Sequence, residues 1–501
     1  MSETAPTYKE TTTKDLSKFY KLERTIHHLS ARPVIGIGIA AIFLSLVWLA
    51  THTITAGVEN QALIVAAGVI GGYMALNIGA NDVANNVGPA FGAKSLTMVG
   101  ALIIAGIFET AGAVIAGGDV VQTISKGIID PDLILDTDTF LWAMMSAMLA
   151  AALWINFATY FGAPVSTTHS IVGGVMGAGI AAAGTAVVDW TVMAKIAGSW
   201  IISPVLGGIV AAIFLAFLKR KVLYQQDPIA AAKHWVPILI ALMAGVFSAY
   251  LSVKGLKKVW KPEPWVVVLI GAGFMAATYA VVNPLIAKHA TSMENTKKAI
   301  RGLFHVPLIC AAALLSFAHG ANDVANAVGP LAAIVNSAST GAGAAAQVEI
   351  PTWGLFVGAA GITMGLMLFG PKLIRTVGDK ITRMNPMRAY CVALSAAITV
   401  IIASAMGLPV SSTHIAIGAV FGVGFFREYH TSRGGHINGS AKKADRPPSK
   451  WDLLPAEEKS RRRKLVRRQY LWTIIAAWLI TVPLSAIFAG GIYAGLRAFL
   501  G

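Results

Sequence analysis

The sequence contains one polar phrase twice, and each copy closes a long apolar run. Gly79–Asn85 and Gly320–Asn326 both read Gly-Ala-Asn-Asp-Val-Ala-Asn. In a helix, the aspartate and the second asparagine of this phrase lie three positions apart and share a face. The preceding glycine allows the helix to open and expose backbone carbonyls. Carboxylate, amide and carbonyl oxygens together would then suit a hard cation such as sodium.

The ordinary alternative is that these polar side chains only join helices through hydrogen bonds. An ionisable aspartate is a costly group for that purpose inside a membrane, and it occurs in both copies, which favours a cation site. Sodium is predicted at Asp82 and Asp323. The predicted cation-binding residues of the two phrases are Asn81, Asp82, Asn85, Asn322, Asp323 and Asn326.

A second phrase is also repeated, as Ala163–His169 (APVSTTH) and Leu408–His414 (LPVSSTH). Proline followed by hydroxyl residues is typical of a helix start. A helix that begins inside the membrane directs its free N–H groups to the centre, and two such ends make a receptor for an oxyanion. The alternative is two simply capped helices. The predicted anion-binding residues are Ser166, Thr167, Thr168, Ser411, Ser412 and Thr413.

The order of the phrases indicates a duplicated unit. Asp82 precedes His169 by 87 residues, and Asp323 precedes His414 by 91. Two unrelated phrases that recur in the same order and at nearly the same spacing indicate an internal repeat. Many secondary transporters are built from such repeats. Both histidines are interpreted as residues that orient the hairpins rather than as direct coupling groups.

Glu109 is an acid within an apolar segment and has no evident counterpart. Aligning Ala105–Ile107 on Ala360–Ile362 places Met364 opposite it. We interpret Glu109 as part of a cation site that only one copy uses, with a buried structural hydrogen bond as the alternative.

Membrane helices must position these residues. The chain is 55% hydrophobic and 13% charged, with a mean hydropathy of +0.66, far from a soluble domain. Crossing the hydrocarbon takes roughly 20 residues, and nine spans are predicted at 34–52, 62–80, 96–117, 190–218, 235–252, 265–287, 302–320, 350–370 and 471–497. Two more apolar stretches, 140–184 and 389–426, contain the Pro-Val-Ser phrase. Each is predicted as two half-length helices in a re-entrant hairpin.

The net charge of +16 concentrates in loops beside these spans, which is typical of positive-inside topology rather than of a nucleic-acid-binding protein. The N-terminus is predicted to be cytoplasmic, and the acidic loop 118–139 to lie outside. The predicted inside loops are 219–234, 288–301, 371–388 and 427–470. If both hairpins return to their side of entry, the two copies are inverted. This topology has one exception to the positive-inside rule, because it places four lysines outside: Lys254, Lys257, Lys258 and Lys261.

The predicted fold class is an all-α integral membrane protein, an inverted-repeat secondary transporter with two re-entrant helical hairpins. Its predicted parts are a cytoplasmic segment 1–33, an additional N-terminal span and loop 34–59, a first repeat 60–218, connecting loops and helices 219–301, and a second repeat 302–497.

Several other classes of protein are disfavoured. Cys310 and Cys391 both lie in apolar segments, so the cysteines predict neither a disulfide framework nor a cysteine-bound metal. Gly88–Ser95 is similar to a phosphate-binding loop, but it lacks the Gly-Lys pair and follows a membrane helix, so ATP hydrolysis is not predicted. No nucleophile and base stand at a plausible spacing. We therefore predict neither an enzyme nor a cofactor, with an ion gradient as the source of energy.

The two aspartate phrases, each followed by Val-Gly-Pro, resemble the signature of the PiT family of inorganic phosphate transporters. The resemblance extends to Ile107–Thr110 and to both Pro-Val-Ser hairpins, and covers most of residues 60–425 and the last span. It implies an inverted-repeat fold, phosphate as the usual substrate and symport with sodium or protons. It also implies that the motif Asp and Asn residues bind sodium in sodium-coupled members, and that the hairpin Ser and Thr residues bind phosphate. Here these are Asn81, Asp82, Asn322 and Asp323, with Ser166, Thr167, Thr168, Ser411, Ser412 and Thr413.

Some relatives carry a further acid in the helix before each hairpin. The corresponding Trp142–Ser146 and Val392–Ser395 have none, so the relatives' stoichiometry does not carry over. Proton-coupled bacterial members often have a less regular first phrase than this one. Sodium is therefore favoured over protons as the coupling ion.

The predicted function is secondary active import of inorganic phosphate by symport with sodium, through alternating access around a central site between the two repeats. The predicted location is the plasma (inner) membrane, with the lipid bilayer, phosphate and sodium as partners and no nucleic acid; a homodimer is left open. The alternatives are a proton-coupled phosphate or metal-phosphate symporter, a sulfate permease and a passive anion channel.

Overall fold

A computed structural model describes residues 33–134, 136–255, 260–291, 293, 296–340, 349–378, 384–432 and 468–500. Within these ranges every named element is a helix, and ten helices are long and apolar enough to cross a membrane. The chain is therefore a multi-pass membrane protein, as its composition predicts. The predicted N-terminal segment up to residue 32 and residues 433–467 of the basic loop lie outside the described residues.

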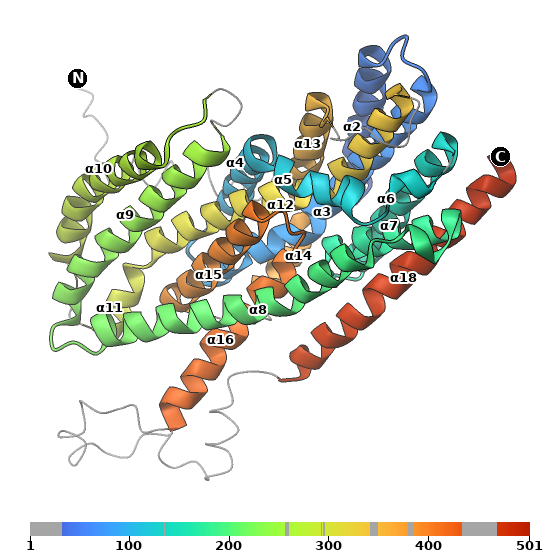
Figure 1. The fold of residues 1–501 in the computed structure, drawn as a ribbon. Helices are drawn as coiled ribbons and strands as arrows, with labels where there is room; N and C mark the ends of the chain where they lie inside the picture. The colour runs from blue at the N-terminus through green and yellow to red at the C-terminus, as the bar shows by residue number, and fades with distance from the viewer. Residues whose placement is uncertain are drawn as a thin grey trace, which may run out of the picture.

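The helices lie close to the predicted spans, and Figure 1 shows the long ones packed side by side. The span predicted at 350–370 is a pair of helices, α13 and α14, bent by 61°. The elements are α2 (Pro33–Ile54), α3 (Gln61–Gly92), α4 (Met98–Ala116), α5 (Gly118–Gln122), α6 (Thr137–Tyr160), α7 (Thr167–Ala183), α8 (Trp190–Leu218), α9 (Pro228–Lys254), α10 (Pro264–Thr291), α11 (Lys297–Gly302), α12 (His305–Thr340), α13 (Thr352–Leu368), α14 (Gly370–Thr376), α15 (Pro386–Ala405), α16 (Ser412–Ser432) and α18 (Arg468–Leu500).

The two predicted hairpins are present as helix pairs, but their arms are not half-length. α6 and α7 have 24 and 17 residues, and α15 and α16 have 20 and 21. The first arms, α6 and α15, each qualify as a span, which raises the number above the nine predicted. Gly162 and Gly407 permit the turns between the arms, because both adopt a positive φ, 71° and 68°, that favours glycine. Return of each hairpin to its side of entry stays a prediction.

The glycines of the repeated phrase do not open their helices, so that expectation was wrong. α3 and α12 are continuous through Gly79 and Gly320. These glycines instead allow close helix packing: a Cβ on Gly79 would lie 1.9 Å from the carbonyl oxygen of Ile362, and one on Gly320 would lie 2.1 Å from that of Glu109. Close approach of helix backbones at small residues is the usual packing of membrane helices.

The two copies of the duplicated unit are interlocked. α3 packs on α13, α12 on α4, α7 on α18 and α16 on α8. Each pair joins a helix of the first copy to one of the second. Glycines form the contact in the hairpin pairs as well, where Gly177 meets the backbone of Ala486 and Gly422 meets that of Gly208. Helices of both copies therefore surround one common centre (Figure 1).

The two ends of the molecule carry different charges. Lys254, at the end of α9, forms an ion pair with Asp119 of the acidic 118–139 loop. The lysine that seemed misplaced by the positive-inside rule thus has an acidic partner. α9 has 27 residues and so is about 40 Å long, which places the basic turn before it, with Lys219 and Arg220, at the opposite end.

This arrangement predicts the accessibility of the two ends. In a chain whose Cys310 and Cys391 are replaced by alanine, a cysteine at Asp132 should react with an impermeant maleimide added to intact cells, and a cysteine at Gln225 should not. Both positions are exposed, so Gln225→Cys should react once the membrane is permeabilised. Labelling of both positions from outside would contradict the predicted topology.

Candidate functional site

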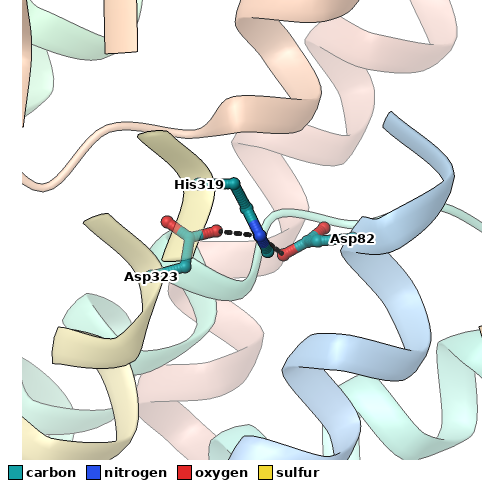
Figure 2. Close-up of side chains that lie close together, drawn as sticks. All are labelled: Asp82, His319 and Asp323. Atoms are coloured by element: carbon teal, nitrogen blue, oxygen red, sulfur yellow. Dashed lines mark ion pairs between the residues drawn. The ribbon is translucent and has the colours of Figure 1, made fainter. Parts of the chain in front are cut away.

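Asp82 and Asp323 meet at the centre of the molecule with a third side chain between them. α3 carries Asp82, and α12 carries Asp323 and His319 one turn before it. The Nε2 atom of His319 lies 2.9 Å from Oδ2 of Asp323 and 3.7 Å from Oδ2 of Asp82. Figure 2 shows the imidazole directed between the two carboxylates. All three side chains are buried.

Glu109 of α4 approaches the other side of the same imidazole. Its Oε2 lies 3.3 Å from Nδ1 of His319, and its Oε1 accepts a hydrogen bond from the amide of Asn86 at 2.7 Å. Both ring nitrogens of His319 therefore face carboxylate oxygens. When both nitrogens carry a proton, the ring is a cation that faces an acid on each side.

Sequence reasoning missed His319. The signal was present, because a histidine four residues before an aspartate on a helix lies next to it, and this one directly precedes Gly320. The first copy has Ile78 at the same position before Gly79. The difference between the copies thus lies one residue outside the identical phrases.

The alignment that placed Met364 opposite Glu109 was wrong by two residues. Gly79 meets Ile362 in the same way that Gly320 meets Glu109, so the counterpart of Glu109 is Ile362. In agreement, the hydroxyls of Thr110 and Thr363 form a hydrogen bond of 2.6 Å. The expected absence of an acidic counterpart still holds.

Asn81 and Asn322 hold the hairpin turns. The Asn81 amide donates to the Thr159 hydroxyl (2.9 Å) and the Ala163 carbonyl (3.2 Å), and its oxygen accepts from the Val165 N–H (3.1 Å). The Asn322 side chain makes the matching bonds to Ser404, Leu408 and Val410 at 2.8, 3.2 and 3.4 Å. This geometry matches the helix-joining alternative for these two residues, and their contact with a cation stays a prediction.

The six hydroxyls predicted to bind an anion gather at the facing starts of α7 and α16, and they divide into three kinds. Ser166 and Ser411 cap their own helices, since each accepts the N–H of the histidine three residues later. The hydroxyls of Thr167 and Ser412 donate to the aspartate of their own copy, at 2.8 Å to Asp82 and 3.4 Å to Asp323.

The remaining hydroxyls cross between the copies. Thr168 donates to the carbonyl of Val410 at 3.0 Å. Thr413 donates to Oδ1 of Asp82 at 3.0 Å and accepts from the Asn85 amide at 2.7 Å. The Asn326 amide reaches the Thr168 hydroxyl at 3.2 Å. The two helix starts and the two aspartate phrases therefore form one hydrogen-bonded network.

His169 and His414 lie behind these helix starts. Their ring centroids are 4.7 Å apart, and the His169 ring also packs at 3.9 Å on Trp200, whose indole donates to the Pro409 carbonyl at 3.1 Å. This position, away from the aspartates, fits the predicted orienting role.

The central cluster has the composition of a cation site. Ligand atoms of Asp82, His319 and Asp323 all lie within 4.8 Å of one another. Within the described residues, buried oxygens of Asn86, Asp323 and Asn326 have no hydrogen-bond partner. Unpartnered carboxylate and amide oxygens are favourable ligands for sodium, since a hard cation prefers oxygen.

Comparison with known proteins gives consistent results. A family model described as the phosphate transporter family matches residues 78–489. A protein of Helicobacter pylori strain J99, named as a candidate phosphate permease, is 43% identical over 91% of this chain and 95% of its own. A candidate phosphate permease of Pyrococcus furiosus is 36% identical over 86% of this chain and 96% of its own. A solved structure described as the sodium-dependent phosphate transporter is similar with a TM-score of 0.76 and 35% identity, covering 88% of this chain and 100% of the other.

The geometry predicts that His319 balances the acids around it. His319→Gln should lower the free energy of unfolding by about 3–5 kcal/mol in sodium-free buffer, because it leaves buried carboxylates without their cation. Denaturant unfolding of the purified protein measures this loss, and exposed Glu59→Gln should change stability by less than about 0.5 kcal/mol.

A double-mutant cycle separates this effect from a packing defect. Glu109→Gln combined with His319→Gln should be more stable than the sum of the single effects by about 1 kcal/mol or more, since the two residues are in contact. Strict additivity would show that Glu109 and His319 do not interact.

Proposed function

Because this chain belongs to the phosphate transporter family, we propose that its buried acids couple the transport of inorganic phosphate into the cell to the entry of sodium. Sodium is supported by the oxygen-rich centre and by the sodium-dependent phosphate transporter that this chain resembles in structure. The proposed sodium ligands are Asp82 and Asp323, with Asn85, Asn326 and Glu109 nearby. Alternating access of the centre to the two sides of the membrane is part of the proposal.

One observation carries the proposed coupling: the hydroxyls of Thr167 and Thr413 both donate to Asp82. A cation at Asp82 would compete for the same carboxylate oxygens. Hydroxyls released from Asp82 would then be free to donate to an oxyanion at the starts of α7 and α16, where helix N–H groups already favour negative charge. A cation at Asp82 would therefore favour binding of the oxyanion at the helix starts, and the bound oxyanion would favour the cation in turn.

The same contacts argue against a passive channel. The helix starts of α7 and α16 touch through the Thr168–Val410 hydrogen bond and are joined by the network around Asp82. A channel needs a continuous polar path, whereas these contacts close the centre between the two hairpins.

A proton is the second candidate for the coupling ion, and His319 is the observation that favours it. An imidazole between carboxylates is suited to holding a proton. Sodium and protons are distinguished by imposing their gradients separately in proteoliposomes and measuring uptake of labelled phosphate, with unlabelled sulfate as competitor. The proposal expects uptake driven by sodium alone and little competition by sulfate; uptake driven only by the proton gradient would refute sodium coupling.

Neutralising either aspartate should abolish coupled uptake. Asp82→Asn and Asp323→Asn keep the side-chain shape but remove the charge next to the cation, so we expect sodium-driven phosphate uptake to fall at least tenfold. A loss of about 1.4 kcal/mol in ion binding corresponds to a factor of ten. Full sodium-driven uptake by both variants, with the amount of reconstituted protein matched, would exclude these residues as the cation site.

Removing the crossing hydroxyls should weaken phosphate binding. Thr168→Val and Thr413→Val preserve the branched shape and delete one donor each, so the apparent Kd for phosphate should rise roughly tenfold per charge-assisted bond. Thr53→Val, on exposed α2, is the matched control and should leave the Kd unchanged. Unaltered affinity in both hairpin variants would show that the hydroxyls serve only the protein's own network.

A further inference from the structure

A second charged site lies away from the centre, where the α8 helix turns into α9. A cavity of 840 Å³ opens there, lined by Lys219, Arg220, Tyr224, Asp227, Phe426 and His430, among others. Lys219 lies over the ring of Phe426 at 5.1 Å from its centroid, and the rings of Tyr224 and His430 stack at 5.6 Å. Two segments far apart in sequence thus build one pocket.

Positive charge dominates this region. The charges of Arg301, Arg388 and Arg427 act on one another, and those of Arg388 and Arg427 also act on Lys219. The Nε atom of Arg301 is buried, and no hydrogen-bond partner for it occurs in the described residues. Arg388 and Arg427 therefore add to the positive potential at Lys219, although none of the three arginines lines the cavity.

The acid that lines the cavity is already engaged by the protein. Asp227 caps α9 by accepting the N–H groups of Ile229 and Ala230, at 3.1 Å each. A bound anion would relieve the repulsion among the cations, as phosphate groups do in basic clusters.

An apolar groove continues from this cavity. It has a volume of 550 Å³, lies between α8 and α16, and shares Phe426 with the basic cavity. Its walls include Val205, Ile209 and Tyr429, which are 57%, 53% and 54% exposed on the outer surface of the helices. α16 packs against α8, and Figure 1 shows the two helices crossing near their labels. These exposed walls open the groove to the lipid, and its inner end reaches His414 behind the start of α16.

The depth of the cavity in the membrane follows from the sequence of α8. From Ile196 to Leu218 the helix carries no charged residue, and Lys219, Arg220 and Lys221 follow directly. This is the position at which a membrane helix leaves the hydrocarbon and meets the lipid headgroups.

We propose that this site binds an anionic phospholipid, with its phosphate in the basic cavity and one acyl chain in the groove between α8 and α16. The charge accounts for the phosphate, and the continuous apolar groove accounts for the chain. A free phosphate ion would use the cavity and leave the groove without a function. The proposal is independent of the ion that drives transport.

The full-length protein, purified in detergent and stripped of lipid, allows a direct test. Native mass spectrometry should show retention of dioleoyl phosphatidylglycerol, and its apparent affinity should exceed that of dioleoyl phosphatidylcholine at least tenfold. Glycerol 1-phosphate, which has the headgroup charge but no chains, should bind much more weakly than phosphatidylglycerol. Equal affinity for the two lipids, or equal affinity for glycerol 1-phosphate, would overturn the proposal.

Single substitutions locate the site. Lys219→Gln and Arg220→Gln should each weaken phosphatidylglycerol binding about fivefold, the usual effect of one cation near a membrane surface. Lys221→Gln is the matched control, since Lys221 is exposed beside the cavity but does not line it, and it should change affinity less than twofold. Ile209→Gln, at an exposed position of the groove, should weaken binding of the lipid and spare that of glycerol 1-phosphate. Equal losses in the cavity variants and in Lys221→Gln would show only nonspecific attraction to lipid and refute the site.

Discussion

Three carboxylates meet around one imidazole at the centre of this membrane protein, and a protonated His319 would supply the positive charge that they need. Asp82, Asp323 and Glu109 come from three different helices, and the imidazole contacts all of them. Removing water from several like charges without compensation would cost many kcal/mol. The meeting of α3, α4 and α12 therefore depends on this side chain, on a bound cation, or on both.

The same cluster makes the two copies unequal. His319, Glu109 and Asn86 form the polar part of the cluster. The residues at the matching positions of the opposite copy are Ile78, Ile362 and Ala327. Backbone contacts, caps and hairpin bonds occur in both copies with nearly the same distances, so the scaffold is symmetric where the chemistry is not. The duplicated frame carries two aspartates, and the three residues that differ between matching positions give the centre its additional polar groups.

Much of this structure follows from the sequence by simple physical reasoning. Apolar length predicts the spans, and the repeated phrases predict that Asp82, Asp323 and the six hydroxyls converge. What sequence reasoning could not supply is how helices of the two copies contact one another. The error of two residues at Glu109 arose because a pair of glycines looked equivalent in the sequence, whereas backbone contact decides which residues match. The glycine before each aspartate was expected to let its helix open. A glycine in a helix also allows another backbone to approach closely. The sequence of one helix does not distinguish these two roles, because the difference depends on the neighbouring helix.

The interlocked packing decides which parts of the molecule can move as units. Where a carbonyl oxygen occupies the place that a Cβ would need, as between Gly79 and Ile362 or Gly422 and Gly208, one helix cannot slide past the other without first separating from it. α3 must then travel with α13, α12 with α4, α7 with α18 and α16 with α8. Each of these helix pairs contains one helix from each copy, so a hinge placed between the sequence repeats would separate the partners of all four pairs. Any boundary between moving parts that keeps these pairs intact would therefore have to cross the duplication, and cutting the chain between its repeats would separate the two members of every pair.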